Sequence, residues 1–201
     1  MPDTVATAPH RPALTLPPRE AAVLRHRYEV ASVVLEYGSG GSTVLAAEMP
    51  GKQVFSVESD PVWAAGIQTW LDTAGLAAQV TLHVVDIGPT GDWGAPVSDE
   101  GWRHYHHYPL SVWDRGDFKH PDVVLIDGRF RAACLMATML RIERPVTVLF
   151  DDYVDRKFYH RVEAFAEPVA FIGRMARFEL EPRAFPSRDM TRIFDLFTRP
   201  N

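Results

Sequence analysis

The sequence predicts an α/β fold, a three-layer sandwich in which helices cover both faces of a mostly parallel, seven-stranded sheet that ends in an antiparallel hairpin. Five short apolar runs each end in a carboxylate, and segments of helical character separate them. This alternation is typical of parallel strands joined by crossover helices, with the polar strand ends at one edge. Two later runs alternate polar and apolar residues, which is typical of antiparallel strands with one solvated face.

The first elements follow from local signals. Residues 1–17 are rich in proline, alanine and threonine, so we expect a flexible N-terminal arm before a single domain over residues 18–201. Proline is tolerated in the first turn of a helix, and the first helix is expected from Pro18 to about Glu29. Asp60 is suited to cap a helix that begins at Pro61 and stops at Gly75.

The remaining elements follow from the same patterns. Parallel strands are expected at residues 33–36, 54–58, 80–86, 121–128 and 146–152, and the antiparallel pair at 176–180 and 192–197. Further helices are expected at residues 42–48, 129–139 and 153–166. Residues 88–120 depart from the alternation and form an insertion rich in tryptophan, tyrosine and histidine. A long connection at the ligand edge of a sheet is often a lid or a substrate wall.

The composition excludes several classes of protein. Hydrophobic residues make up 46% and charged residues 23% of the chain, as in a globular protein. The net charge is −5 with no long basic run, so we expect no nucleic-acid partner. No apolar run reaches the length of a membrane span, and the N-terminal residues lack the pattern of a signal peptide, so we expect a cytoplasmic protein with no membrane partner. The single cysteine, Cys134, excludes an internal disulfide and is expected to be a buried thiol.

A glycine-rich turn after the first strand indicates a ligand site. Its spacing is Gly38-x-Gly40-Gly41. A dinucleotide-binding fingerprint would need a third glycine where Thr43 stands, and a P-loop would need a lysine, so neither phosphate motif fits. Glu36 lies two residues before the first glycine and would repel a phosphate. The turn therefore favours a ligand with a cationic group, such as an amino group or a sulfonium.

Acidic residues at later strand ends indicate a nucleoside. Glu58 ends the second apolar run, 22 residues after Glu36, and suits a bidentate hydrogen bond to a ribose diol. Asp86 ends the third run and Asp127 the fourth. Because the carboxyl ends of parallel strands meet at one edge, we expect these side chains to surround one ligand.

The motif Glu36-x-Gly38-x-Gly40-x-Ser42-Thr43, followed in order by Glu58, Asp86 and Asp127, resembles the class I S-adenosylmethionine-dependent methyltransferases, which have a Rossmann-like sheet. The resemblance covers roughly residues 20 to 199. It implies that the acid after the second strand holds the ribose hydroxyls and that the acid after the third strand faces the adenine. The cofactor-binding residues that it implies are Glu36, Gly38, Gly40, Ser42, Thr43, Glu58, Ser59, Asp86 and Ile87.

Each cofactor assignment has a plainer alternative. Glu36 could hold the methionine ammonium or cap a turn amide, and Glu58 could be an ordinary acid at a strand end. Adenine could be recognised by backbone groups or by Ile87 rather than by Asp86. Trp93 could stack on the base or anchor its loop.

Strand-end aspartates are the candidates for catalysis. Asp127, Asp151 and Asp152 would repel one another without a cation, and hard oxygen ligands suit Mg²⁺ or Ca²⁺, of which we expect Mg²⁺. The pattern resembles the metal-dependent, catechol-type O-methyltransferases, which carry asparagine where this chain has Asp152. That resemblance implies catalytic roles for Asp127 and Asp151 and a metal site formed by all three aspartates. The alternative is that the aspartates cap turns and pair with arginines, the candidates being Arg129, Arg131 and Arg156.

The insertion offers a second set of candidate bases. His104, His106 and His107 carry imidazoles that are suited to proton removal near neutral pH. Their spacing matches no known metal-ligand pattern, and no single histidine is favoured.

These observations together favour an S-adenosylmethionine-dependent methyltransferase that acts on a small molecule, at oxygen. Asp127-Gly128-Arg129-Phe130 stands where enzymes that methylate the amino groups of bases or of glutamine carry an Asn/Asp-Pro-Pro-Tyr/Phe signature. The alternative is a nucleoside-cofactor-binding protein of the same fold that is silent or reacts differently, for example as an aminopropyl transferase. A homodimer is compatible with either function.

Overall fold

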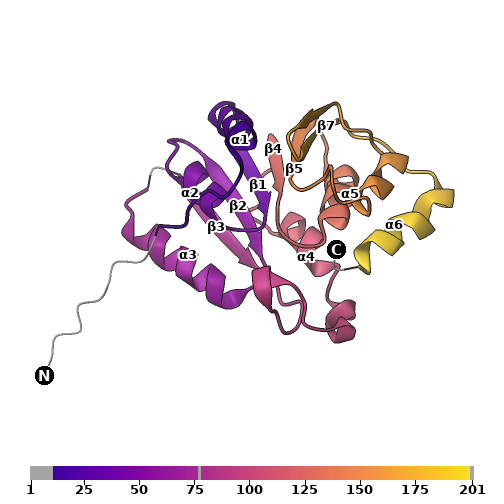
Figure 1. The fold of residues 1–201 in the computed structure, drawn as a ribbon, viewed down its shortest axis with the longest axis horizontal. Coiled ribbons are helices and arrows are strands. Elements are labelled where there is room, and N and C mark those ends of the chain that lie inside the picture. The colour runs from indigo at the N-terminus through magenta and orange to yellow at the C-terminus, as the bar shows by residue number, and fades with distance from the viewer. Residues whose placement is uncertain (1–10, 77, 200–201) are drawn as a thin grey trace, which may run out of the picture.

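The computed structural model describes residues 11–76 and 78–199 and contains one seven-stranded sheet with the order β3-β2-β1-β4-β5-β7-β6 (Figure 1). Its strands are β1 (Val33–Tyr37), β2 (Gln53–Glu58), β3 (Gln79–Val84), β4 (Val123–Ile126), β5 (Val146–Phe150), β6 (Ala170–Ile172) and β7 (Met175–Leu180). Strands β1 to β5 pair in parallel, and β7 pairs antiparallel with β5 and β6. The predicted fold class is confirmed, because the sheet is mostly parallel and ends in an antiparallel hairpin.

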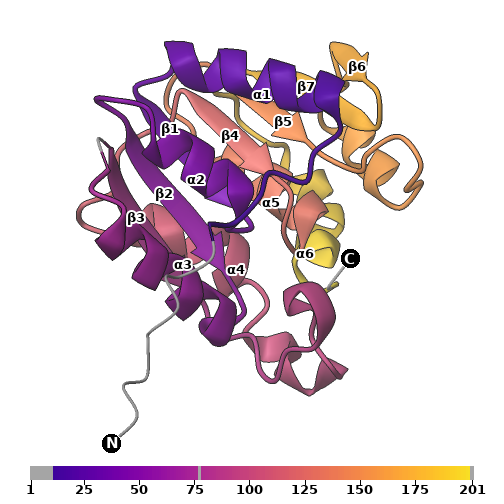
Figure 2. The ribbon, with the colours of Figure 1, turned by 60° about the vertical axis from the view of Figure 1, so that its left-hand side comes forward.

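Helices form the outer layers of the sandwich. They are α1 (Pro18–Val30), α2 (Gly41–Ala47), α3 (Pro61–Thr73), α4 (His107–Leu110), α5 (Arg131–Arg141) and α6 (Met190–Phe197). Alternate residues of the central strands face opposite layers, as the side-chain period of two requires. Val34 packs in one apolar cluster with α1 and α2, whereas Leu35 packs in a second with α5 and α6. Figure 2 shows the two pairs of helices on opposite sides of the sheet. None of the helices in residues 11–76 and 78–199 is long and apolar enough to cross a membrane.

The closing hairpin differs from its prediction in one strand. Residues 176–180 lie in β7 as expected, but their partner is β6, and residues 192–197 belong to helix α6 instead. Ile193, Leu196 and Phe197 are buried together in the cluster that contains α5. Their spacing is helical, and a six-residue run is too short to separate a period of two from one of 3.6.

The segment after β5 also differs from its prediction. Residues 153–166 form turns and a short 3-10 helix, Tyr159–Ala164, in place of a long helix. The backbone N–H groups of Tyr153 and Val154 both donate to the carbonyl of Arg174 in the β6–β7 turn. These bonds hold the chain against the hairpin where a helix would have to begin.

Helix boundaries that rested on capping chemistry are confirmed. Asp60 accepts hydrogen bonds from the backbone N–H groups of Val62 (2.8 Å) and Trp63 (3.0 Å), and Pro61 is the first residue of α3. Gly75 follows α3 with a φ of 59°, which suits a helix stop.

The N-terminal arm is ordered in its described part. Residues 1–10 lie outside the described residues, but Leu16 is buried in the cluster of α1 and α2. Arg11 donates to both carboxylate oxygens of Glu48 at 2.8 to 3.0 Å. Residues 11–17 are therefore a packed segment rather than a flexible arm.

One prediction concerns the β6–β7 turn of the hairpin, which contacts Glu20 of α1. Gly173 has a φ of 55°, and a Cβ at this position would overlap the buried carboxylate of Glu20, which accepts a hydrogen bond from the N–H of Arg174 (3.0 Å). Gly173→Ala should lower the free energy of unfolding by about 2 to 4 kcal/mol, since left-handed strain adds to the overlap. Gly51→Ala is the control, because Gly51 has a φ of 72° and open space around it, so only strain of about 1 to 2 kcal/mol applies. Equal losses for the two variants in urea unfolding would contradict the proposed contact.

Candidate functional site

A cavity of about 520 Å³ opens at the carboxyl edge of the parallel strands. This volume lies within the range of small-molecule sites. Its walls come from the turns after β1, β2 and β4, from residues 12–15 and from the insertion. Open α/β sheets bind ligands at this edge, where the strand order reverses between β1 and β4.

The glycine turn meets the turn after β4 across the cavity floor. Gly38 has a φ of 102°, and a Cβ there would lie 2.7 Å from the Cα of Gly128. A Cβ on Gly128 would in turn lie 2.8 Å from the Cα of Gly38. Only glycine at both positions allows this approach, so the predicted glycine signal is also a packing constraint between neighbouring strand ends.

Glu36 lies behind the glycine turn and does not line the cavity. Its carboxylate is fully buried and accepts hydrogen bonds from the hydroxyls of Tyr28 (2.6 Å) and Thr43 (2.6 Å). The Thr43 hydroxyl accepts a further bond from the N–H of Gly40 (2.9 Å). Burial raises the pKa of Glu36, while these hydroxyl bonds oppose the shift. Glu36 therefore supports the turn through the Thr43 hydroxyl rather than by capping a turn amide directly, and an ammonium contact would need these bonds to open.

Glu58 lines the cavity as predicted. One carboxylate oxygen accepts from the N–H of Ser39 (3.1 Å), and the other accepts from the N–H groups of Ser59 (2.7 Å) and Asp60 (2.9 Å). Burial raises its pKa, and the three backbone bonds counteract the shift. Gly38, Gly40, Ser42 and Ser59 line the same cavity, so the structure brings together these five of the nine proposed cofactor residues.

Asp86 and Ile87 are not part of the cavity wall. Asp86 is exposed and accepts a hydrogen bond from the N–H of Gly88 (2.9 Å), whereas Ile87 is buried in the core. The insertion presents Trp93 and Gly94 to the cavity instead, and the Ser59 hydroxyl donates to the Gly94 carbonyl (2.9 Å). Adenine recognition by Asp86 therefore stays a prediction without geometric support.

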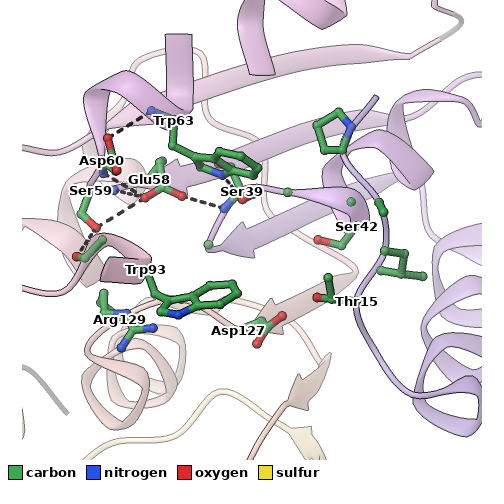
Figure 3. A pocket seen from close by; sticks show the side chains of 18 of the residues that line it. Thr15, Ser39, Ser42, Glu58, Ser59, Asp60, Trp63, Trp93, Asp127 and Arg129 are labelled. Atoms are coloured by element: carbon green, nitrogen blue, oxygen red, sulfur yellow. Dashed lines mark hydrogen bonds between the residues drawn. The ribbon is translucent and has the colours of Figure 1, made fainter. Parts of the chain in front are cut away.

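Two tryptophans lie on opposite walls of the cavity (Figure 3). Trp63 donates from its indole nitrogen to the carbonyl of Ser39 (2.8 Å), which fixes its ring beside the glycine turn. Trp93 is 85% exposed and has a φ of 58°, a conformation that non-glycine residues rarely adopt. An exposed indole on a strained backbone at a cavity wall is suited to cover a planar ligand group.

The histidines of the insertion lie away from the cavity. His104, His106 and His107 are exposed and do not line it, whereas Tyr108 is buried and does. The insertion thus forms part of the wall, as expected, but through Trp93, Gly94 and Tyr108 rather than through an imidazole.

The three strand-end aspartates have different surroundings. Asp127 lines the cavity, and one of its oxygens pairs with Arg131 at 3.2 Å. Burial raises the pKa of Asp127 to about 7, against the lowering effect of Arg131. Asp151 is fully buried and holds Arg174 through both oxygens, at 2.6 and 3.1 Å.

The arginines argue against a metal at these aspartates. Asp152 pairs with Arg156 (2.7 Å) and also contacts Arg131 and Arg174 at 3.3 and 3.1 Å. Three guanidinium groups therefore neutralise three carboxylates. Residues 11–76 and 78–199 contain no group of three histidine, cysteine, aspartate or glutamate side chains placed to hold a metal ion. The predicted Mg²⁺ site does not fit this network, and the alternative of arginine partners describes it.

Sequence patterns missed two parts of the wall. Pro12, Ala13, Leu14 and Thr15 line the cavity, and the backbone of Ala13 packs so closely on Gly41 that a Cβ there would overlap it. Arg129 also lines the cavity, although it was considered only as a partner for an aspartate. A low-complexity N-terminal segment and a single arginine carry no periodic signal, so only packing reveals these roles.

Comparison with solved structures links this fold to methyltransferases. No protein-family model and no curated protein matches the chain. A solved methyltransferase-like protein from Silicibacter pomeroyi DSS-3 is 54% identical, with a TM-score of 0.89 over 94% of this chain and 99% of that chain.

More distant structures share the fold. The O-methyltransferase TomG from Streptomyces achromogenes, solved with S-adenosylmethionine, is 18% identical, with a TM-score of 0.58 over 85% of this chain and 82% of that chain. An O-methyltransferase-like structure from Klebsiella pneumoniae is also 18% identical, with a TM-score of 0.57 over 86% of this chain and 84% of that chain. Because the chain is 54% identical to a methyltransferase-like protein over nearly all of both chains and has the mostly parallel seven-stranded sheet with the glycine turn at the cavity, it belongs to the class I S-adenosylmethionine-dependent methyltransferase family.

Proposed function

We propose that the protein transfers a methyl group from S-adenosylmethionine to an oxygen atom of a small molecule. The observation that carries this proposal is that Glu58, the last residue of β2, and Asp127, directly after β4, line one cavity on either side of the glycine turn. This arrangement separates a nucleoside end from an acceptor end. When bound, S-adenosylmethionine supplies an activated methyl group, and the residues of this chain orient it and handle the acceptor proton.

The nucleoside end is assigned to Glu58 and Trp93. The Glu58 carboxylate is held by three backbone N–H groups, so its position is fixed before a ligand arrives. A fixed carboxylate suits a ribose diol, and the exposed indole of Trp93 suits an adenine ring. The bond between Ser59 and Gly94 connects these two contacts.

The acceptor end is assigned to Asp127. A group with a pKa near 7 is suited to general acid–base catalysis at neutral pH. Arg131 lies 3.2 Å from Oδ1 of Asp127, and we assign Oδ2 to the proton of an acceptor hydroxyl. Methylation at oxygen requires removal of such a proton, which is the reason that we favour an oxygen acceptor. Asp151 takes no direct part, because its two oxygens bind Arg174.

The ribose role of Glu58 gives a prediction for cofactor binding. Isothermal titration with S-adenosylmethionine should show binding to the native protein, and Glu58→Ala should weaken it about 10- to 100-fold, because a hydrogen bond to a charged group is lost. The native protein should also bind adenosine about tenfold more tightly than 2′,3′-dideoxyadenosine, and Glu58→Ala should bind the two nucleosides alike. No binding of S-adenosylmethionine at millimolar concentration would refute the proposed function, and retained preference for adenosine in Glu58→Ala would refute the ribose contact.

The raised pKa of Asp127 gives a prediction for pH dependence. The ionised carboxylate accepts the proton, so kcat/KM should rise with pH and level off above about 7. Asp127→Asn should lower kcat by about 100-fold or more and remove this dependence, with binding of S-adenosylmethionine unchanged. The pH–rate profile of Asp151→Asn is the comparison, since this variant loses an ion pair rather than a base. An unaltered profile in Asp127→Asn would assign the proton transfer elsewhere.

The arginine network gives a prediction for metal dependence. Because arginines already neutralise Asp127, Asp151 and Asp152, we expect methyl transfer to be unchanged by EDTA and by added Mg²⁺. The rate is measured before and after chelation on the same preparation. Loss of activity on chelation that Mg²⁺ restores would show that the aspartates release their arginines to bind a metal.

A further inference from the structure

Arg129 differs from the other charged residues of the cavity wall. Glu58 is bound by backbone N–H groups, Asp60 caps α3 and Asp127 pairs with Arg131. Among the described residues, the guanidinium of Arg129 has no carboxylate partner, and its buried Nε has no hydrogen-bond partner. A buried donor without a partner costs free energy, so this group needs an explanation.

The unpaired guanidinium of Arg129 contrasts with those of three neighbouring arginines. Arg131, Arg156 and Arg174 each bind a strand-end aspartate in the same region. Burial and the charge of Arg131 both lower the pKa of Arg129, in keeping with a cation that has no carboxylate partner among the described residues. An anion in the cavity would compensate it.

The position of Arg129 assigns it to the acceptor end. It follows β4, whereas Glu58 ends β2 on the other side of β1. The side chains that shift the pKa of Arg129 include Arg131 of α5, Tyr108 of the insertion, and Tyr159 and Arg156, which follow β5, the next strand outward. In Figure 3, Arg129, Trp93 and Asp127 lie along one side of the cavity, across from Glu58 and Trp63.

We propose that Arg129 binds a carboxylate of the methyl acceptor, so that the substrate is a small hydroxy acid whose hydroxyl faces Asp127. This inference rests on the proposed function, since it names the substrate class of the same site. A guanidinium binds a carboxylate through two parallel hydrogen bonds, which fixes orientation as well as position. A fixed carboxylate would align the acceptor oxygen for an in-line displacement.

The charge of the wall favours a monoanion. Glu58, Asp60 and Asp127 also line the cavity, and one unpaired guanidinium faces them. A phosphate of nearly two negative charges would meet more repulsion from these acids than a carboxylate would. We therefore assign the site to a carboxylate rather than to a phosphate.

Binding of simple aromatic probes tests the assignment without knowledge of the natural substrate. Benzoate, its neutral analogue benzamide and phenyl phosphate are titrated into protein saturated with S-adenosylhomocysteine. Native protein should bind benzoate at least tenfold more tightly than benzamide or phenyl phosphate. Arg129→Met should lose at least tenfold in benzoate affinity with benzamide unchanged, and Arg129→Lys should recover part of the loss. Arg192→Met, which removes an exposed arginine of α6 that does not line the cavity, is the control with the same charge change.

The outcomes separate this inference from the proposed function. Equal affinities of native protein for benzoate and benzamide, tighter binding of phenyl phosphate, or undiminished benzoate binding by Arg129→Met would each overturn the carboxylate site. A tenfold loss of S-adenosylhomocysteine affinity in Arg129→Met would assign the guanidinium to the cofactor and overturn it as well. If S-adenosylmethionine fails to bind while benzoate still depends on Arg129 in cofactor-free protein, the proposed function fails and the anion site stands.

Discussion

A buried carboxylate, Glu36, holds the part of the structure on which the cavity depends. It joins three elements, because Tyr28 comes from α1, Thr43 from α2 and Glu36 itself from β1. A buried charged group is costly unless it is hydrogen-bonded, so this carboxylate favours a single arrangement of its donors. That arrangement sets the Gly40 amide through Thr43 and thereby the path of the glycine turn. The cavity floor, where Gly38 meets Gly128, follows from that path.

The strand ends were predictable from sequence because buried parallel strands are short apolar runs with polar termini. Glu58 and Asp127 fall at one cavity for this reason. What lies beyond a strand end was less predictable, since Asp86 turns to solvent while Trp93 takes its place in the wall. The direction of a side chain after a strand depends on the loop that follows it, and loops carry no period. The same limit applies to residues 192–197, whose short pattern fitted a strand and whose packing against α5 produced a helix.

The sequence also could not predict which charged residues far apart in the chain form ion pairs. Asp151 and Arg174 are 23 residues apart and meet because β7 runs antiparallel to β5. Aspartates in sequence alone are equally suited to a metal or to arginines. Only the hairpin decides between these, because it brings Arg174 to the end of β5. The resemblance to the catechol-type enzymes lies in the fold, whereas the metal site that it implied does not fit the arginine pairs of Asp127, Asp151 and Asp152.

Because arginines bind Asp151 and Asp152, the side chains available for catalysis lie on the β4 side of the cavity. With Asp151 and Asp152 bound by arginines, the end of β5 becomes a rigid support for Arg131, which also donates to the carbonyls of Asp127 and Asp151. Arg131 thus fixes the backbone of the β4 turn and one oxygen of Asp127 together. A base held in this way has its second oxygen in a defined place, and Arg129 extends from the same turn. In the proposed function, one turn of four residues after β4, at positions 127–130, supplies both the group that takes the proton and the charge that orients the methyl acceptor, and the β2 side binds the nucleoside.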